Sequence, residues 1–237
     1  MDVEADSGRQ LPLLPERQPL GDVRRSGHVH ERPDRISEEV TGVIEDVLAF
    51  IIEIDKLKGV LRKVKPLGLE RYENPAEHTW QIALLAWSLE PFAASPVDMN
   101  RVIKLLLVHD IGEIDTGDTM AFVTDGAAER KSAERVAIER IFGLLPAPRR
   151  DEMIALWQEF DDEVTPEARL AHAADRAMPV LLNLANNGQS WRENGITYER
   201  VVKRVGPQID AGCPALWQHL KRRLAEENAN GWFGIRP

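Results

Sequence analysis

Two histidines of this chain stand directly beside acidic residues in segments that have the pattern of helices. His109 is followed by Asp110 at the end of a leucine-rich run, and His78 follows Glu77. Such a pair at the end of an apolar helix needs a partner, because burying an unpaired charge costs several kcal/mol. A metal ion is one such partner. A lone histidine on an apolar helix is otherwise a hydrogen-bonded core residue.

A third acidic group belongs to a helix rich in small residues. Asp175 follows two alanines and precedes an apolar run, so we expect it to face inward; an ion pair with Arg176 or Arg169 is the alternative. Two imidazoles and two carboxylates from three helices suit an octahedral divalent ion with open positions, such as Mn²⁺, Co²⁺, Mg²⁺ or Fe²⁺, better than a closed structural zinc site. The four candidate ligands are His78, His109, Asp110 and Asp175.

The elements that must position these side chains are all predicted to be helices. From Ser37 onward, apolar residues recur three or four positions apart behind a Ser-Glu-Glu start. Asn74, Pro75 and Glu77 form the start signal of a second helix, expected to run to about Phe92. Asp98 can cap a third, which leads into His109.

Five more amphipathic segments complete the predicted architecture, at about residues 127–144, 148–162, 166–186, 198–209 and 214–226. Pro179 should bend the segment in which it lies. Since no repeat or linker divides residues 37–237, we expect one all-α helical bundle there. Residues 1–36 are rich in Pro and Arg and show no period, which indicates a disordered tail.

Composition narrows the classes of function. The 237 residues are 43% hydrophobic and 29% charged, and no apolar run reaches the roughly 18–20 residues of a membrane span. Cys213 is a single cysteine and the start lacks a secretory signal pattern, so we expect a reducing cytoplasm and no membrane association. The net charge of −9 opposes binding to nucleic acid.

The order of these residues resembles the H…HD…D signature of HD-domain metal-dependent phosphohydrolases. The segments 73–80, 107–119 and 174–179 are similar to the subgroup that contains the bacterial 5′-deoxynucleotidases, and the resemblance covers roughly Lys56 to Trp191. It implies an all-α HD-domain bundle with one divalent metal ion held by His78, His109, Asp110 and Asp175. Members of the family with two ions use additional histidines between the HD pair and the last Asp. His172 is the only histidine in that interval of this sequence, so the resemblance favours a single ion.

The resemblance also implies roles for further residues. Glu113 matches the catalytic Glu of the family, and Asp118 matches a second acid that positions the nucleophile or leaving group. Arg62 and Arg71 stand where the family places basic residues that meet the substrate phosphate. Glu159, or Asp161 if the register shifts, resembles a Glu near the nucleoside.

The resemblance implies that phosphate is released from (deoxy)nucleoside 5′-monophosphates by metal-activated water, with Mn²⁺, Co²⁺ or Mg²⁺ as the expected ion and Fe²⁺ or Zn²⁺ as alternatives. Lys63 replaces the Trp that excludes a ribose hydroxyl in the best-known members, so the sugar preference stays open. A hydrolase of another phosphorylated metabolite and a nucleotide-binding regulator with little turnover are the alternatives. The family resemblance also favours a homodimer.

Overall fold

A computed structural model describes residues 38–123 and 125–233 of the chain. Those residues form helices joined by turns and loops, and no strand occurs among them. The predicted all-α fold is therefore confirmed. The predicted tail at residues 1–36 lies outside the described residues, so the division of the chain into tail and domain stays a prediction.

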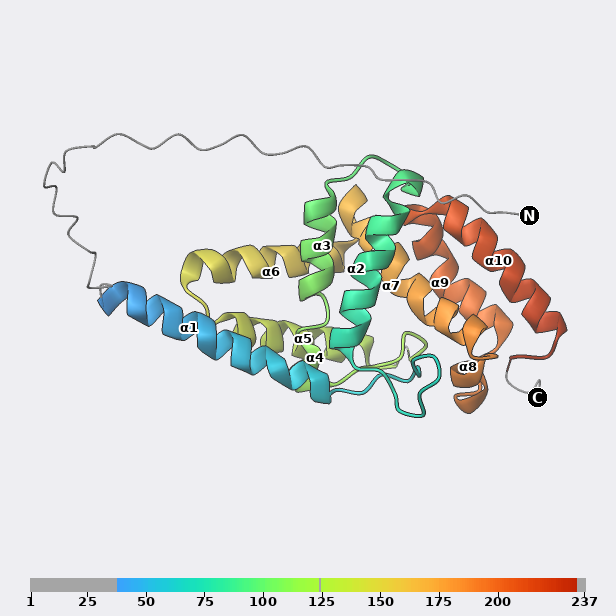
Figure 1. Cartoon of the computed structure of the whole chain (residues 1–237), viewed down its shortest axis with the longest axis horizontal. Coiled ribbons are helices and arrows are strands. Elements are labelled where there is room, and N and C mark those ends of the chain that lie inside the picture. Colours follow the sequence, from blue (N-terminus) through green and yellow to red (C-terminus); the bar gives the residue numbers. More distant parts are fainter. Residues whose placement is uncertain (1–37, 124, 234–237) are drawn as a thin grey trace, which may run out of the picture. The chain divides into compact units, whose positions relative to one another are not determined.

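The helices follow one another along the chain as Figure 1 shows. Their bounds are α1 (Glu38–Ile54), the 3₁₀ helix η1 (Asp55–Gly59), α2 (Pro75–Leu89), the 3₁₀ helix η2 (Glu90–Phe92), α3 (Met99–Val108), α4 (Glu113–Thr116), α5 (Ala127–Phe142), α6 (Ala147–Asp162), α7 (Pro166–Ala185), α8 (Gln189–Glu193), α9 (Tyr198–Gly212) and α10 (Pro214–Ala229). The predicted helices are present, and the sequence did not predict the short α4 and α8. Helix α7 continues through Pro179.

The predicted start of α2 is formed by its own side chains. The carboxamide oxygen of Asn74 accepts a hydrogen bond from the Glu77 amide at 3.0 Å, and the Glu77 carboxylate accepts one from the Asn74 amide at 3.4 Å. Pro75 occupies the first helical position, where no amide hydrogen is needed. This reciprocal cap satisfies two backbone donors and fixes where His78 enters the core.

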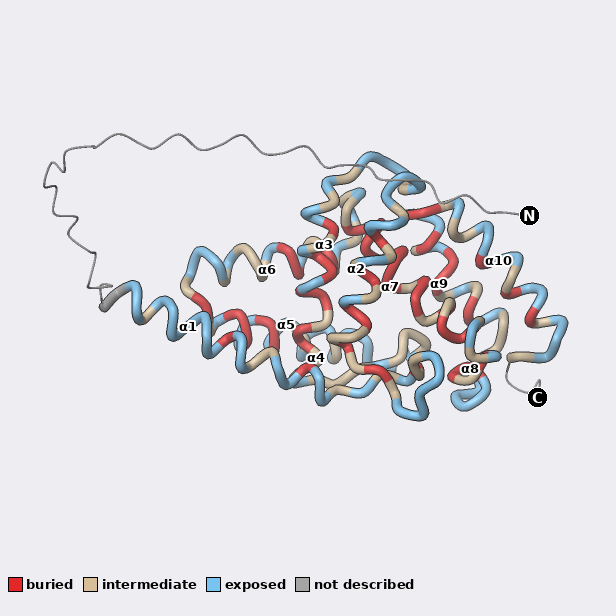
Figure 2. The backbone as a smooth tube through the Cα atoms, in the orientation of Figure 1, coloured by how far each residue is buried: buried red, intermediate tan, exposed pale blue. Residues whose placement is uncertain are grey.

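Helix α7 is the centre of the described structure, and it contacts α2, α3, α6 and α9 (Figure 2). Its alanines allow this close approach on several sides, because a methyl group is all that each places between two backbones. Ala171, Ala173, Ala174 and Ala177 are fully buried. Asp175 lies on the same helix and is 5% exposed, so it faces inward as the sequence predicted.

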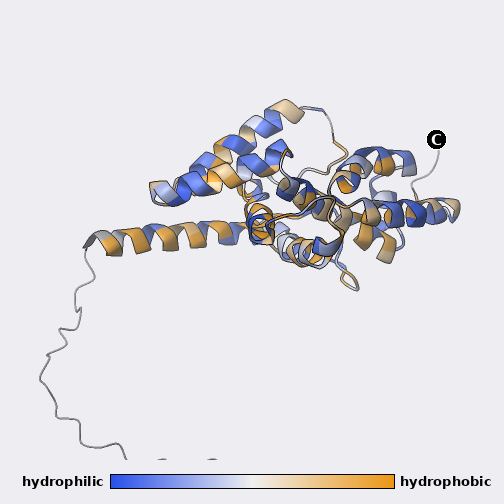
Figure 3. Cartoon of the chain, turned by 90° about the horizontal axis from the view of Figure 1, so that it is seen from above, coloured by the Kyte–Doolittle hydropathy of each residue, from blue (hydrophilic) through white to orange (hydrophobic). Residues whose placement is uncertain are grey.

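Helix α1 has the predicted amphipathic pattern, with apolar residues recurring along its length (Figure 3). Most of these apolar side chains are nevertheless exposed. Phe50 is its buried anchor, with its ring centroid 6.1 Å from that of Phe142 on α5. Val47, Leu48 and Ile51 are between 39% and 57% exposed. Within the described part of the chain, no helix is both long and apolar enough to cross a membrane.

Candidate metal centre and its pocket

The four predicted metal ligands lie together where α2, α3 and α7 meet. One ligand atom each from His78, His109 and Asp110 fall within 4.8 Å of one another. The Oδ1 atom of Asp175 lies 3.0 Å from Nε2 of His78 and 4.0 Å from Nε2 of His109. Residues that are 97 positions apart in the chain are thus brought into one cluster.

The hydrogen bonds of His109 leave one of its ring nitrogens turned toward this cluster. Its Nδ1 donates to the Leu106 carbonyl oxygen at 2.7 Å, so in the neutral ring Nε2 keeps its lone pair. This Nε2 is buried and forms no hydrogen bond among the described residues, although Oδ1 of Asp110 is only 3.0 Å away. An acceptor nitrogen facing carboxylate oxygens fits a shared cation, with the second ring nitrogen fixed by a backbone carbonyl.

Glu73 is a buried carboxylate beside this cluster; it begins the family-like segment 73–80, but no role was predicted for it from the sequence. It is 2% exposed and accepts a hydrogen bond from Nε of Arg62 at 3.1 Å. Its Oε1 also lies 3.6 Å from Nδ1 of His78. Burial raises the pKa of Glu73 to about 7, and the nearby Arg62 charge opposes that rise. Glu73 stands in a connector without periodicity, where the sequence pattern gives no signal of burial.

Arg62 is the cation that joins Glu73 to the acidic side of the pocket. Its Nη1 donates to Oδ2 of Asp110 at 3.2 Å and lies 3.7 Å from Oδ1 of Asp118. Burial alone would lower the pKa of Arg62, but the charges of Asp110 and Asp118 raise it above its ordinary value. The Arg62 side chain is 12% exposed and lines the pocket, while its predicted contact with a substrate phosphate stays a prediction.

Glu113 and Asp118 complete the acidic wall. Glu113 begins α4, and its Oε2 atom is buried without a hydrogen-bond partner among the described residues. Burial, followed by the charges of Asp110 and Asp118, raises the pKa of Glu113 to about 10. Burial also raises the pKa of Asp118, an effect that Arg62 partly offsets. Both side chains line the same pocket as His109 and Asp110.

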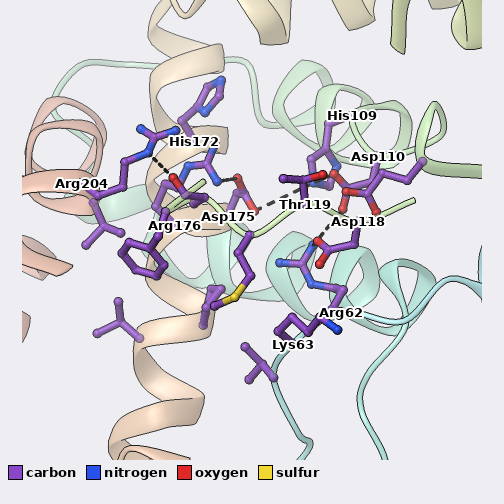
Figure 4. Close-up of a pocket in the computed structure, with 18 of the residues that line it drawn as sticks. Arg62, Lys63, His109, Asp110, Asp118, Thr119, His172, Asp175, Arg176 and Arg204 are labelled. Atoms are coloured by element: carbon purple, nitrogen blue, oxygen red, sulfur yellow. Dashed lines mark hydrogen bonds and ion pairs between the residues drawn. The ribbon is translucent and has the colours of Figure 1, made fainter. Parts of the chain in front are cut away.

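This pocket has a volume of about 410 Å³ and extends from the histidine cluster along α7 to α9 (Figure 4). His172 lines it as well, and the ring of Phe160 packs against both His172 and His109, with centroid distances of 4.0 Å and 4.9 Å. Asn183 and Trp191 also line the pocket.

Two of the predicted substrate residues do not line this pocket. Arg71 is 52% exposed and forms a bidentate ion pair with Glu77 on the surface. Glu159 pairs with Arg101 and accepts a hydrogen bond from Thr165. Because each residue turns an α-helix by about 100°, residues two positions apart on α6 point in nearly opposite directions. Asp161, the alternative in register, lines the pocket instead.

Comparison with known proteins agrees with this geometry. The model of the family described as HD domain matches residues 54–217. The 5′-deoxynucleotidase HDDC2 of Xenopus laevis is 27% identical over 161 residues, which are 66% of this chain and 73% of that protein. Its counterpart from Danio rerio is 29% identical over 136 residues, which are 55% of this chain and 66% of that protein.

A solved structure gives the same picture. The crystal structure of a predicted metal-dependent phosphohydrolase from Magnetospirillum magnetotacticum MS-1 has 38% sequence identity and a TM-score of 0.76, and the match covers 82% of this chain and all of that one. The family model covers more than half of the sequence, and the fold carries the clustered His and Asp residues of the predicted signature. This chain is therefore a hydrolase that belongs to the HD domain family of metal-dependent phosphohydrolases.

Proposed function

We propose that this protein is a divalent-metal-dependent phosphomonoesterase that releases phosphate from (deoxy)nucleoside 5′-monophosphates. The single observation that carries the proposal is the buried, unpartnered Nε2 of His109, which faces Asp110 and Asp175 at one end of a 410 Å³ pocket. The names of the curated relatives, 5′-deoxynucleotidases, support the substrate class.

The proposed ligands of one divalent ion are His78, His109, Asp110 and Asp175. Their two nitrogens and two carboxylates suit Mn²⁺, Co²⁺ or Mg²⁺, with Fe²⁺ and Zn²⁺ as alternatives. When bound, such an ion supplies Lewis acidity toward a phosphate oxygen and lowers the pKa of bound water. The hydrogen bond from Nδ1 of His109 to Leu106 supports this assignment, since it holds the ring in the orientation that ligation needs.

Arg62 has the position to bind the substrate phosphate. Its guanidinium lines the pocket beside Asp110 and presents planar N–H donors that match phosphate oxygens. The buried carboxylate of Glu73 accepts from Nε of Arg62 and so holds the fork in place. Arg62 thereby orients the phosphorus centre and offsets the negative charge that develops on the phosphate oxygens.

Glu113 and Asp118 are the proposed proton-handling groups. Both carboxyl groups lie in the pocket wall next to Asp110, within the field of Arg62. We assign to Glu113 the handling of the proton of the attacking water, which requires that the charge of a divalent ion held by Asp110 lowers the raised pKa of this carboxyl group. We assign to Asp118 the positioning of the nucleophile or of the leaving 5′-oxygen. No covalent enzyme intermediate is needed, because water is the nucleophile.

We also propose that the protein acts as a homodimer in the cytoplasm. The exposed apolar face of α1 supports self-association, since Val47, Leu48 and Ile51 would lose contact with water in an interface between copies. The buried, unpaired thiol of Cys213 is consistent with a reducing compartment.

Phosphate release from a panel of deoxy- and ribonucleoside 5′-monophosphates tests the proposal, after chelation of metal and after re-addition of Mn²⁺, Co²⁺, Mg²⁺ or Zn²⁺. Metal-dependent release from the panel is the expected result, and release from both sugars would identify a broader nucleotidase. If every member of the panel stays intact with every ion, the substrate is another phosphorylated metabolite or the protein is a nucleotide-binding regulator.

A further inference from the structure

The pocket has a second group of polar side chains at the end away from His78. This far cluster consists of Arg176 on α7, Arg204 on α9, Glu163 just after α6, and His172 on α7, and all four line the pocket. Figure 4 shows His172, Arg176 and Arg204 near one another beyond Asp175. None of the roles proposed above uses Arg204, Glu163 or His172.

The two arginines give the far cluster a surplus of hydrogen-bond donors. Oε1 of Gln208 accepts from Nε of Arg176 at 3.1 Å and from Nη1 of Arg204 at 3.3 Å. Arg204 forms no ion pair with a carboxylate among the described residues, and Arg176 has only Asp175, at 3.5 Å. Burial and the charge of Arg176 lower the pKa of Arg204. Nε of Arg204 also donates to the Ala121 carbonyl oxygen at 2.7 Å. The two guanidinium groups together carry more N–H donors than these contacts use, so they can donate further to a ligand in the pocket.

His172 and Glu163 form the acceptor side of the far cluster, and Oε1 of Glu163 already accepts a hydrogen bond from Nε2 of Gln208 at 2.5 Å. Nε2 of His172 donates to the Phe160 carbonyl oxygen at 2.8 Å, so Nδ1 carries the lone pair of the neutral ring. The ring is 4% exposed, and Nδ1 has no hydrogen-bond partner among the described residues. Oε1 of Glu163, which is itself an acceptor, lies 3.6 Å from this Nδ1. A donor from a ligand would satisfy Nδ1 of His172.

We infer that the far cluster recognises the lactam edge of an oxo base, in which a carbonyl oxygen stands beside a ring N–H. This inference rests on the proposed function, which places the phosphate of the nucleotide at the other end of the pocket. The carbonyl oxygen accepts from Arg176 and Arg204, and the ring N–H donates to Nδ1 of His172 or to the second carboxylate oxygen, Oε2, of Glu163. Guanine, hypoxanthine, thymine and uracil share this edge, whereas adenine and cytosine present an amino donor beside a bare ring nitrogen.

The position of the far cluster agrees with a base that follows its sugar. The ring of Phe160 packs against both His172 and His109, with centroid distances of 4.0 Å and 4.9 Å, and Arg176 lies 3.5 Å from Asp175, so the far cluster adjoins the metal centre. Phe122 and Trp191 also line the pocket and offer aromatic surface to a planar base.

Two pairs of substrates differ only in this edge and test the inference with wild-type protein loaded with Mn²⁺. The deoxynucleotide of hypoxanthine is compared with that of adenine, and that of uracil with that of cytosine, by kcat/KM for phosphate release. A site built around a lactam should favour the lactam member of a pair by about tenfold or more, because the amino member leaves donors and acceptors of the site unpaired. Preference in the purine pair alone identifies a 6-oxopurine, and in the pyrimidine pair alone a 4-oxopyrimidine.

Variants of the far cluster provide a second readout. In the favoured pair of substrates, Glu163→Gln and Arg204→Gln should each bring the ratio of kcat/KM between the lactam member and the amino member toward one. The matched controls Asp162→Asn and Lys203→Gln should leave it unchanged, because these exposed neighbours do not line the pocket. Equal kcat/KM within both pairs, or preference for the amino member, would overturn the inference and leave the proposed function standing. Absence of phosphate release from all four substrates would overturn the proposed function and this inference together.

Discussion

Gly212, at the end of α9, has the least room for a side chain of the described glycines. A Cβ atom on Gly212 would lie 2.1 Å from the carbonyl oxygen of Arg169 and 2.7 Å from Cβ of Ala173. The carbonyl oxygen belongs to the backbone of α7, so it cannot rotate away as a flexible side chain could. Gly212→Ala must therefore displace the end of α9 from α7, the helix that carries Asp175.

The cost follows from that displacement. Overpacking a close contact costs about 1–3 kcal/mol, and a clash with rigid backbone belongs at the upper end, near about 3 kcal/mol. For a protein of this size, 1 kcal/mol corresponds to a change in Tm of about 2–4 °C. We therefore expect Gly212→Ala to lower Tm by about 6–12 °C.

Gly42→Ala is the matched control. Gly42 lies within α1, and a Cβ atom there would meet nothing within 4 Å. The same substitution should raise stability by about 0.5–1 kcal/mol at this position, because alanine favours the helix over glycine. Thermal and urea unfolding of both variants provides the measurement. A Tm for Gly212→Ala equal to that of the wild type, or a larger loss from Gly42→Ala, would refute the reasoning.

Three further predictions concern the metal centre and the fold around it. His109→Ala should reduce phosphate release to the level of chelated protein while the far-ultraviolet circular dichroism stays that of a folded helical protein; full activity would contradict the assignment. A divalent ion at 100 times its Kd should stabilise the wild type by about 2.7 kcal/mol, or about 5–10 °C in Tm, and Asp175→Asn should lose most of this shift in calorimetry. Hydrogen bonds from Lys56 and Arg140 hold the pKa of Glu53 below its ordinary value of 4.5, so its stabilising contribution is present above that pH and is lost as pH falls through the folded pKa. Glu53→Gln should therefore flatten the fall of Tm between about pH 6 and pH 3, and an unchanged slope would count against this pair of contacts.

Local sequence signals predicted the helical fold well, because each depends on residues close in the chain. The cap at Asn74 and the spacing of apolar residues in α1 both correspond to observed helices. Helices α4 and α8 are only four and five residues long, too short to show a period. Amphipathic spacing predicts that a segment is helical, but it does not predict whether the apolar face of that helix is covered. For this reason the sequence did not predict that the apolar face of α1 is exposed.

Some residues of the candidate site could be predicted from the sequence, and others could not. His78, His109, Asp110 and Asp175 are recognisable because their types and order are unusual, and the structure brings them together. Arg71 and Glu159 have partners of opposite charge on the surface, Glu77 and Arg101, which a single sequence does not reveal.

The far cluster depends on contacts that no local pattern carries. Gln208 joins Arg176 to Arg204 across α7 and α9, and Glu163 reaches His172 only because α6 ends beside α7. These residues are ordinary surface types in the sequence. Tertiary packing alone gives them a shared pocket, which is why sequence reasoning assigned none of them a role in binding.

Stepwise addition of Mn²⁺ to chelated protein, followed by phosphate release from a deoxynucleoside 5′-monophosphate, tests the central claim most directly. The account predicts no activity without the ion, a rise that saturates at one equivalent per chain, and no rise in Asp110→Asn. Full activity in the chelated protein, or an equal response to Mn²⁺ in Asp110→Asn, would contradict the assignment of this cluster as the metal centre of the hydrolase.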